Sequence, residues 1–523
     1  MQLNIFILFG FFILLLSLII AVLRILNVSK KEIVNNKNKN ENEFDLIIVG
    51  AGLSGLTAAY EAIKLRNSSL KIVLLKASPD FGGNSINEID GINILISDKK
   101  RHKKGKKDNF SLFYNDSLEF GQFAGDPDLL TVLVDKSQEL LDFFINDLIC
   151  NNLTKIKSEG SRFPRTFIYN ISNMTTGKYL STSIYNRLKD ISTTKILFNS
   201  HFIDLLIDAN HTIVHGVKYT QSLNESKNIS VISKAVILCT GGYGADFYTN
   251  ESILNESLVQ LYYFPTFSTK FTRGEGLKIA RNKGAELVDQ RFGEIYPTCF
   301  VNFNDRFNRH KIILPDKMRE LGAIIMNKRG KRFCDEMNNR RYVGQNILKN
   351  CDIVTDPKII KQYEAFIIIN EAIKKSYGNE EIDDFINKGY LIKYNSFEDF
   401  AKDMNISQYF KNIQKSVNNY NEAFQNKYDS FGRKNFTHKF KMKQDIYVGI
   451  VTPCTFHTFG GVKITNEGEI INTKDRIISG LFAAGEVIGG IHGVMALQGN
   501  ILTQAAVFGR IAAKGAVDYI HKS

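Results

Sequence analysis

The sequence has few cysteines, and they lack any metal-binding arrangement. Six cysteines are spread over 523 residues, and none belongs to a C-x-x-C pair. The spacings typical of zinc sites, iron–sulfur clusters and covalently attached haem are therefore absent. Isolated cysteines usually act as small buried apolar residues. We expect no bound metal and no haem, and the pattern requires no disulfide framework.

Acidic residues are fewer than basic ones, and the formal net charge is +13. Lysine and asparagine crowd segments that look like linkers and loops, such as KKEIVNNKNKNENE at 30–43. This distribution indicates a solvated basic exterior, so we expect no nucleic-acid partner, although the overall field still favours acidic ligands. A chain of this length can form two or more domains.

The first four residues carry no basic side chain, and a long apolar run follows them. Residues 5–23 are long and apolar enough to cross a bilayer. A cleaved signal usually begins with a basic segment and has a shorter apolar core, so we favour an uncleaved membrane anchor at 1–25 over a removed signal. Basic residues after the run favour a cytosolic position for the rest of the chain. A polar linker at 26–43 would follow, and we expect the endoplasmic reticulum membrane, with the mitochondrial membrane as the alternative.

A strand, a glycine-rich turn and a helix are predicted directly after the linker. Residues 44–49 are apolar without helical periodicity, GAGLSG follows at 50–55, and a helix is expected through Leu65. Residues 72–75 are predicted to form a second strand. In such a β–α–β context, G-x-G-x-x-G strongly indicates dinucleotide binding.

Each glycine of this turn has a physical role. Gly50 permits the tight turn, Gly52 lets the backbone approach a pyrophosphate, and Gly55 lets the helix pack close to the strand. The helix N-terminus offers amides and a positive dipole to phosphate. The second strand, however, ends in Lys76, where such units usually carry an acid for the adenosine ribose. We expect this lysine to weaken the adenosine end of the site while the pyrophosphate site persists.

Two further glycine-rich segments also follow apolar strands. Residues 231–247 are predicted to form a strand that ends near Gly241 and Gly242, and residues 478–493 a late strand with a glycine-rich loop. Because nucleotide motifs lie near both ends of the chain, we expect one nucleotide-binding domain with an insertion. The predicted division assigns 44–290 and 457–523 to the nucleotide-binding domain and 291–456 to the insertion.

Four motifs along the chain stand in a characteristic order. They are VGAGLSGL with FGGNS, LCTGGYG, KRFCDEMNNRR, and TPCTFHTFGGVKI with GLFAAGEVIGGIHG. In this order the chain resembles the fumarate reductase/succinate dehydrogenase flavoprotein family, and it looks most similar to the soluble yeast-type and flavocytochrome-type fumarate reductases. The resemblance implies an α/β fold in which a Rossmann-type FAD-binding domain is interrupted by an inserted α+β capping domain. It implies noncovalent FAD held by Gly50, Gly52, Gly55, Gly82, Gly83, Asn84, Ser85, Gly241, Gly242 and Glu486.

The resemblance also implies a reaction. In the family, hydride passes from the flavin to one alkene carbon of fumarate, and an arginine protonates the other carbon. The motif implies that this arginine is Arg340, with a proton path through Asp316 and Arg319. The competing interpretation is that Arg340 forms a structural salt bridge to Glu336 or Asp335.

The substrate clamp of the family is altered here. Tyr296 and Phe456 stand where the family has histidines, and Ala496 stands where it has an arginine. Those side chains hold the two carboxylates of fumarate, and a dianion in a dry pocket requires such partners. His457, next to Phe456, is the remaining candidate catalytic residue.

Positions beside the flavin differ as well. Glu88 and Asp90 stand where the family has small residues that let the backbone touch the ring, and Gln498 stands where it has a glycine. Negative charge near a flavin disfavours its anionic reduced form. These departures favour either a changed substrate or a loss of catalysis.

Three functions are compatible with the sequence. The first is an FAD-dependent oxidoreductase acting on an activated C=C bond, an enoate for example, in a substrate less charged than fumarate. The second is a fumarate reductase with a rearranged clamp. The third is a membrane-tethered, catalytically degenerate relative with weak or no FAD binding. No second G-x-G-x-x-G is present for nicotinamide, so electrons would come from a separate donor.

Overall fold

The computed structural model describes residues 42–523, apart from 67–68, 97–107, 170–173, 222–227, 248–249 and 356–359. The predicted anchor, and the predicted linker as far as residue 41, lie outside the described residues. Within the described part of the chain, no helix combines the length and the apolar character needed to cross a bilayer.

The predicted β–α–β unit is confirmed. Strand β1 (Glu43–Val49), helix α2 (Leu53–Leu65) and strand β2 (Ile72–Leu75) follow one another, and β1 lies parallel to β2 with Leu46 opposite Ile72. All four residues of β2 are buried, as expected for a strand covered on both faces.

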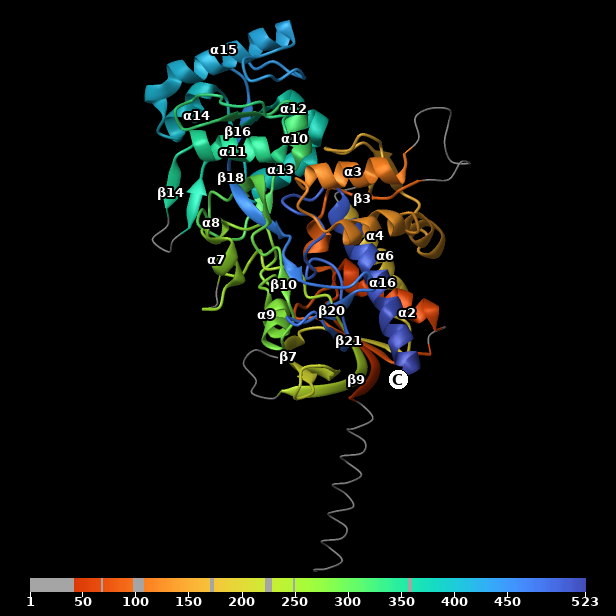
Figure 1. The fold of residues 1–523 in the computed structure, drawn as a ribbon. Coiled ribbons are helices and arrows are strands. Elements are labelled where there is room, and N and C mark those ends of the chain that lie inside the picture. Colours follow the sequence, from red (N-terminus) through yellow and green to blue (C-terminus); the bar gives the residue numbers. More distant parts are fainter. Residues whose placement is uncertain are drawn as a thin grey trace, which may run out of the picture.

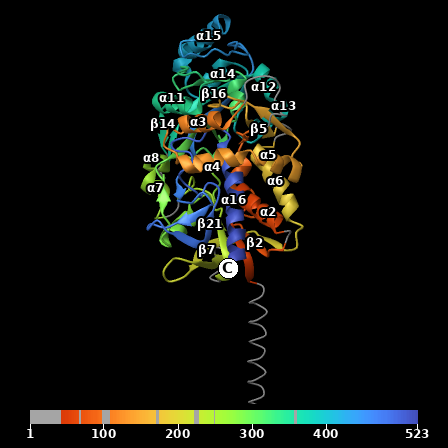
Figure 2. The same cartoon turned by 45° about the vertical axis from the view of Figure 1, so that its right-hand side comes forward.

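The central sheet combines strands from both ends of the chain. Its order is β20-β21-β9-β1-β2-β6, and β21, β9, β1, β2 and β6 run parallel. The C-terminal helix α16 (Asn500–Lys522) packs against α2 and over β9 and β21 (Figures 1 and 2). The other strands of this sheet are β6 (Thr194–Leu197), β7 (His201–Ile207), β8 (Val214–Thr220), β9 (Ile229–Leu238), β20 (Glu469–Ile471) and β21 (Ile477–Ala483).

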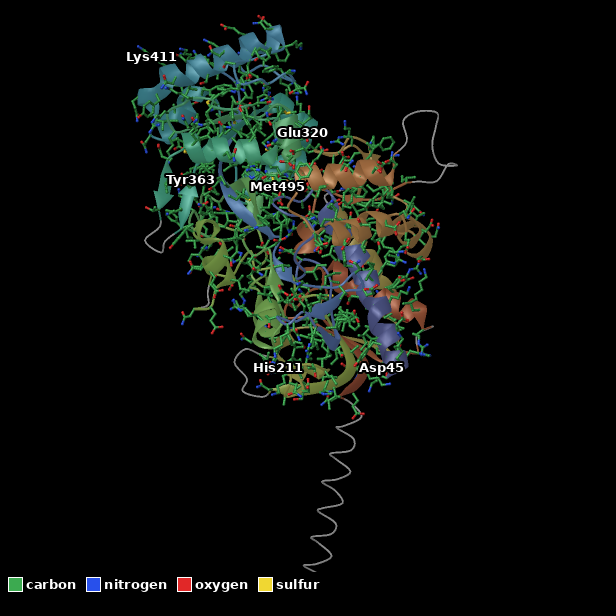
Figure 3. The ribbon with its side chains drawn as sticks, in the orientation of Figure 1. Asp45, His211, Glu320, Tyr363, Lys411 and Met495 are labelled. Carbon is green, nitrogen blue, oxygen red and sulfur yellow. The ribbon has the colours of Figure 1, made fainter. Side chains whose placement is uncertain are left out.

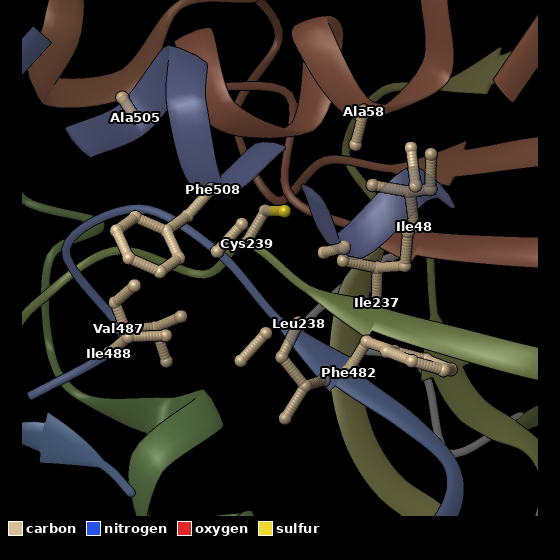
Figure 4. Close-up of a cluster of buried hydrophobic side chains, with 14 of the residues drawn as sticks. Ile48, Ala58, Ile237, Leu238, Cys239, Phe482, Val487, Ile488, Ala505 and Phe508 are labelled. Carbon is tan, nitrogen blue, oxygen red and sulfur yellow. The ribbon is translucent and has the colours of Figure 1, made fainter. Parts of the chain in front are cut away.

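The core beneath these helices is continuous. Side chains from β1, α2, β9, β21 and α16 meet in it, and five of them are Ile48, Ala58, Ile237, Phe482 and Phe508 (Figure 4). Their mutual burial holds the first and last thirds of the chain together and fixes the turns at the ends of β1, β9 and β21 in one place.

A second, antiparallel sheet forms a separate region at residues 293–458, which we call the cap region. Its order is β12-β11-β18-β16-β13, with β17 also paired to β18, and it has its own hydrophobic core. It occupies the upper part of Figure 1. Its strands are β11 (Gly293–Val301), β12 (Ile312–Ile313), β13 (Ile324–Met326), β16 (Ala365–Asn370), β17 (Ile392–Tyr394) and β18 (Ile446–Thr458), with β14 (Ile353–Thr355) and β15 (Lys361–Tyr363) forming a small separate ladder.

Helices cover the cap sheet, and the remaining elements lie outside it. The cap helices are α10 (Asp316–Glu320), α11 (Arg340–Asn350), α12 (Glu371–Tyr377), α13 (Asn379–Asn387), α14 (Phe397–Asp403) and α15 (Phe410–Asn426), with the turn η4 (Ser407–Tyr409). The remaining elements are η1 (Gly83–Asn87), β3 (Ile92–Asn93), α3 (Phe110–Phe120), α4 (Pro127–Ser137), α5 (Leu140–Asp142), η3 (Phe143–Asp147), β4 (Leu153–Ile156), β5 (Thr166–Tyr169), α6 (Thr176–Leu188), α7 (Ile253–Ser257), α8 (Val259–Tyr262), α9 (Glu275–Asn282), β10 (Leu287–Val288) and β19 (Gly461–Val462). The predicted domain boundaries at 290/291 and 456/457 stay predictions.

Candidate active site

The turn between β1 and α2 needs its glycines for steric reasons. Gly50 has a φ of +116°, and a Cβ there would lie 2.1 Å from the carbonyl oxygen of Cys239. A Cβ on Gly55 would lie 1.9 Å from the carbonyl oxygen of Gly50. Gly52 is the N-cap of α2, and a Cβ there would have its nearest neighbouring atom 3.6 Å away. The backbone is therefore exposed at the N-terminus of α2, where an anion is favoured.

The structure brings most of the predicted cofactor residues to one cleft. Gly52, Gly83, Asn84, Ser85, Gly241 and Glu486 all line it, together with Lys76 and His457. Gly50, Gly55, Gly82 and Gly242 form the turns behind its walls, and a Cβ on Gly242 would lie 2.6 Å from Oε1 of Glu486.

The polar groups of this cleft fit the phosphate end of FAD. A Cβ on Gly241 would meet nothing within 4 Å, so the backbone there is open to a ligand. The buried hydroxyl of Thr240 lacks a hydrogen-bond partner among the described residues. The cleft encloses about 70 Å³, less than the roughly 300–1,000 Å³ of typical ligand pockets, so its walls must separate when the whole dinucleotide binds.

Lys76 stands at the adenosine end of this cleft, as its position at the end of β2 requires. Its Nζ atom lies 3.6 Å from where a Cβ on Gly83 would be. Burial lowers the pKa of Lys76 to about 8. A partly desolvated cation in this place supplies positive charge toward an anionic ligand, whereas the usual acid would accept hydrogen bonds from the ribose.

Three titratable side chains meet at the inner end of the cleft. Nε2 of His457 lies 2.8 Å from Oε2 of Glu88, and its Nδ1 lies 3.6 Å from Oε1 of Glu486. Burial alone would lower the pKa of His457, but Glu486 and Glu88 raise it well above its ordinary value. His457 is therefore an imidazolium, and its positive charge neutralises Glu88, one of the acids that the sequence places beside the flavin.

Arg340 is the first residue of helix α11. The side chain of Asn339 caps that helix by accepting a hydrogen bond from the Tyr342 amide. Arg340 donates to Oδ2 of Asp316 from Nε at 3.0 Å and from Nη2 at 2.8 Å. Arg319 donates to the other oxygen of Asp316. The predicted path Arg319–Asp316–Arg340 is thus a continuous hydrogen-bonded chain.

Asp316 is charged in this chain. Burial alone would raise its pKa, but the Arg340 and Arg319 guanidiniums lower it well below its ordinary range. The Tyr296 hydroxyl also donates to Asp316 at 2.8 Å, and the carbonyl oxygen of Leu314 is a second acceptor 3.1 Å away. Tyr296 therefore supports the relay carboxylate, and its hydroxyl is engaged within the protein.

The competing interpretation, a structural salt bridge from Arg340 to Glu336 or Asp335, is wrong in the partners that it names. Glu336 pairs with Arg332 and Arg433, each at 2.7 Å. Arg340 pairs with Asp316 and with Asp90, whose carboxylate accepts from Nη1 at 2.6 Å and from Nη2 at 2.5 Å. No local signal indicates the second pair, because the two residues lie 250 positions apart.

A small pocket adjoins Arg340. It encloses about 20 Å³ and is lined in part by Asp90, Glu159, Glu294 and Ala496, which is room for about one water molecule. Met495 also lines this pocket and lies where the cap region meets the lower region (Figure 3). Phe456 lies apart from this pocket and packs against Phe267.

The glycine cradle and the exposed helix terminus define a dinucleotide-binding protein. A sequence-family profile described as FAD binding domain matches residues 45–502, which is most of the chain. The fold and this match assign FAD as the cofactor and oxidoreductase as the class of the enzyme.

Relatives define the family more closely. A fumarate reductase of Schizosaccharomyces pombe is 30% identical over 488 residues, covering 91% of this chain and 90% of that protein. Fumarate reductase 1 of Saccharomyces cerevisiae is 27% identical over 480 residues, covering 90% and 97%. The chain belongs to the fumarate reductase family of flavoproteins. A solved flavocytochrome c3 fumarate reductase in an open conformation has the same fold, with a TM-score of 0.76 and 25% identity over 92% of this chain and 79% of that one.

Proposed function

We propose that this flavoprotein reduces an activated C=C bond, with Arg340 as the proton donor. FAD, when bound and reduced, would supply the hydride for one alkene carbon, and Arg340 would donate the proton to the other carbon. The observation that carries this proposal is the buried chain Arg319–Asp316–Arg340, which ends at a pocket.

The chain of charges explains how an arginine can donate a proton. A guanidinium normally keeps its proton at any physiological pH. Asp316 contacts both guanidiniums, so a proton that leaves Arg340 is replaced through Asp316 from Arg319, and Arg319 regains its proton from solvent. General acid catalysis by a positioned group of this kind contributes about 10²–10⁴ in rate.

The substrate is proposed to be less charged than fumarate. The pocket beside Arg340 is lined by Phe120, Met495, Leu497 and Ile501 as well as by carboxyl groups. Tyr296 and Phe456 are engaged elsewhere, and Ala496 offers no hydrogen bond. Because the pocket encloses only about 20 Å³, a substrate enters when the segment around Met495 and the cap region separate.

We also propose that electrons come from a separate donor and that residues 5–23 tether the protein to a membrane, that of the endoplasmic reticulum first and that of mitochondria as the alternative. The length and apolar character of that segment support the tether. Membrane flotation of the full chain, against a chain that starts at Glu43, tests it. Recovery of both in the soluble fraction would exclude the tether.

The decisive experiment is anaerobic reoxidation of the bound flavin. The purified protein is loaded with FAD, reduced chemically, and mixed with fumarate, its methyl esters or simple enones. We expect an uncharged or singly charged compound to restore the absorption of oxidised flavin faster than a buffer blank does. A protein that takes up no FAD, or whose reduced flavin is oxidised by none of these compounds, would instead be the catalytically degenerate relative.

A further inference from the structure

Asp90 occupies one edge of the Arg340 guanidinium. Its two carboxylate oxygens accept parallel hydrogen bonds from Nη1 and Nη2, the bidentate geometry in which an arginine binds a carboxylate anion. Asp316 accepts two further bonds from the same side chain. Four hydrogen bonds to two aspartates therefore leave Arg340 with no edge for another anion.

The position of Asp90 is fixed by its surroundings. Nε2 of Gln498 donates to Oδ1 of Asp90 at 3.0 Å, and Oε1 of Gln498 accepts from the Glu159 amide at 2.9 Å. The next residue, Gly91, has a φ of +85°, and a Cβ there would lie 2.6 Å from the carbonyl oxygen of Phe167. The turn that presents Asp90 to Arg340 is thus built from residues of three separate segments.

The charges around the pocket also disfavour a bound anion. Among the residues that line it, Arg340 is the one basic side chain, whereas Asp90, Glu159 and Glu294 are acids. Glu294 lies 3.8 Å from Nη1 of Arg340. An anion that enters this pocket would meet a cation that is already paired and further carboxyl groups, and an unpaired buried charge is very costly.

The geometry points to Asp90 as the residue that determines substrate charge: it is a built-in carboxylate on Arg340, and the site consequently takes an uncharged α,β-unsaturated carbonyl compound and rejects dicarboxylates. This inference rests on the proposed reduction of a C=C bond and adds the class of substrate. Arg340 keeps its hydrogen bonds to Asp316, so the proton path is independent of Asp90.

Calorimetric binding of two unreactive probes tests the inference without turnover. Succinate is a saturated dianion, and succinamide is its uncharged diamide. With the FAD-loaded protein, we expect succinamide to bind at least about tenfold more tightly than succinate. In Asp90→Asn and Asp90→Ser, we expect succinate affinity to rise at least about tenfold, while succinamide affinity stays within about threefold.

Asp80→Asn is the matched control, because Asp80 is an exposed acid on the loop after β2. It removes the same charge and should leave both affinities unchanged. Thermal unfolding shows whether each variant is folded. The inference is overturned if the wild-type protein prefers succinate, or if removing the Asp90 charge leaves succinate binding weak or undetectable. Either result would leave the proposed reduction standing, because flavin reoxidation is measured separately.

Discussion

Two buried clusters of arginines and carboxylates lie next to one another, and their surroundings differ. In the first, Glu336 accepts hydrogen bonds from Arg332 and Arg433, and Asp429 also contacts Arg332. In the second, Arg340 and Arg319 contact Asp316, and Arg340 also contacts Asp90. Each cluster pairs two arginines with two carboxylates.

The difference lies in what adjoins the two clusters. Glu336, Arg332 and Arg433 are almost completely buried, and the amide of Ile325 also donates to Glu336. Arg332 and Asp429 line a cavity of about 340 Å³ that shares no lining residue with the cofactor cleft. The pocket beside Arg340 shares Ile501 with that cleft. The two clusters touch where Arg319 donates to the backbone carbonyl of Glu336 at 2.7 Å. A charge-balanced cluster away from the cofactor cleft supports the fold, whereas one that borders a pocket next to that cleft can serve chemistry.

Arg340→Lys, in the second cluster, should have the largest effect, which is a loss of reaction rate. Lysine keeps the positive charge, but it cannot contact Asp316 and Asp90 in the bidentate geometry of a guanidinium. We expect substrate-dependent flavin reoxidation to fall by about 10²–10⁴ with FAD still bound. Arg329→Lys is the control, because Arg329 is exposed and pairs with Asp352 away from the pocket, and it should react as the wild type does. Equal rates in both variants would remove Arg340 from the reaction.

Glu336→Gln should lower the stability of the protein and leave the rate of the reaction nearly unchanged. It leaves Arg332 and Arg433 buried with one carboxylate fewer, and breaking a buried pair costs about 3–5 kcal/mol. Chemical denaturation measures this loss, and Glu422→Gln, on the exposed face of α15, should change stability by less than about 0.5 kcal/mol. The reoxidation rate per bound flavin should stay near that of the wild type. A rate loss as large as that of Arg340→Lys would mean that the two clusters act as one.

Acid should weaken the first cluster in a defined pH range. Burial alone would raise the pKa of Glu336, but Arg332 and Arg433 lower it from 4.5 to about 2. The carboxylate therefore contributes stability that is fully present above about pH 4.5 and is lost as the pH falls toward 2. A shift of this size corresponds to about 3 kcal/mol. Glu336→Gln should lose correspondingly less stability over that range, and parallel curves for both proteins would contradict the assignment.

Local sequence patterns were sufficient for the cofactor cradle. An apolar run followed by closely spaced glycines specifies β1, the turn and α2, because each requirement is met within a dozen residues. The path from Arg319 to Arg340 followed from the family resemblance, which carries long-range information that a single sequence lacks.

Partners that are distant in sequence could not be inferred in this way. Glu88 and His457 lie 369 positions apart, and Asp90 and Gln498 lie 408 apart. The sequence showed Glu88, Asp90 and Gln498 as separate departures that add charge or bulk beside the flavin, and His457 as a candidate catalytic residue. In the folded protein they compensate one another in pairs, which is visible only once the two ends of the chain are brought together.

Substitution of Glu294 should have the smallest effect. It changes the pH profile of the reaction, whereas protonation of Glu336 in the first cluster changes the pH profile of stability. Burial raises the pKa of Glu294 to about 7, with Arg340 opposing the shift. As the pH rises through 7, the new carboxylate stabilises the protonated Arg340 at 3.8 Å and should slow proton donation by up to about tenfold. Glu294→Gln should remove this inflection from the pH profile of flavin reoxidation. The inflection would survive the substitution if it belonged to one of the other charged neighbours of Glu294, which are Asp90, Glu88 and His457.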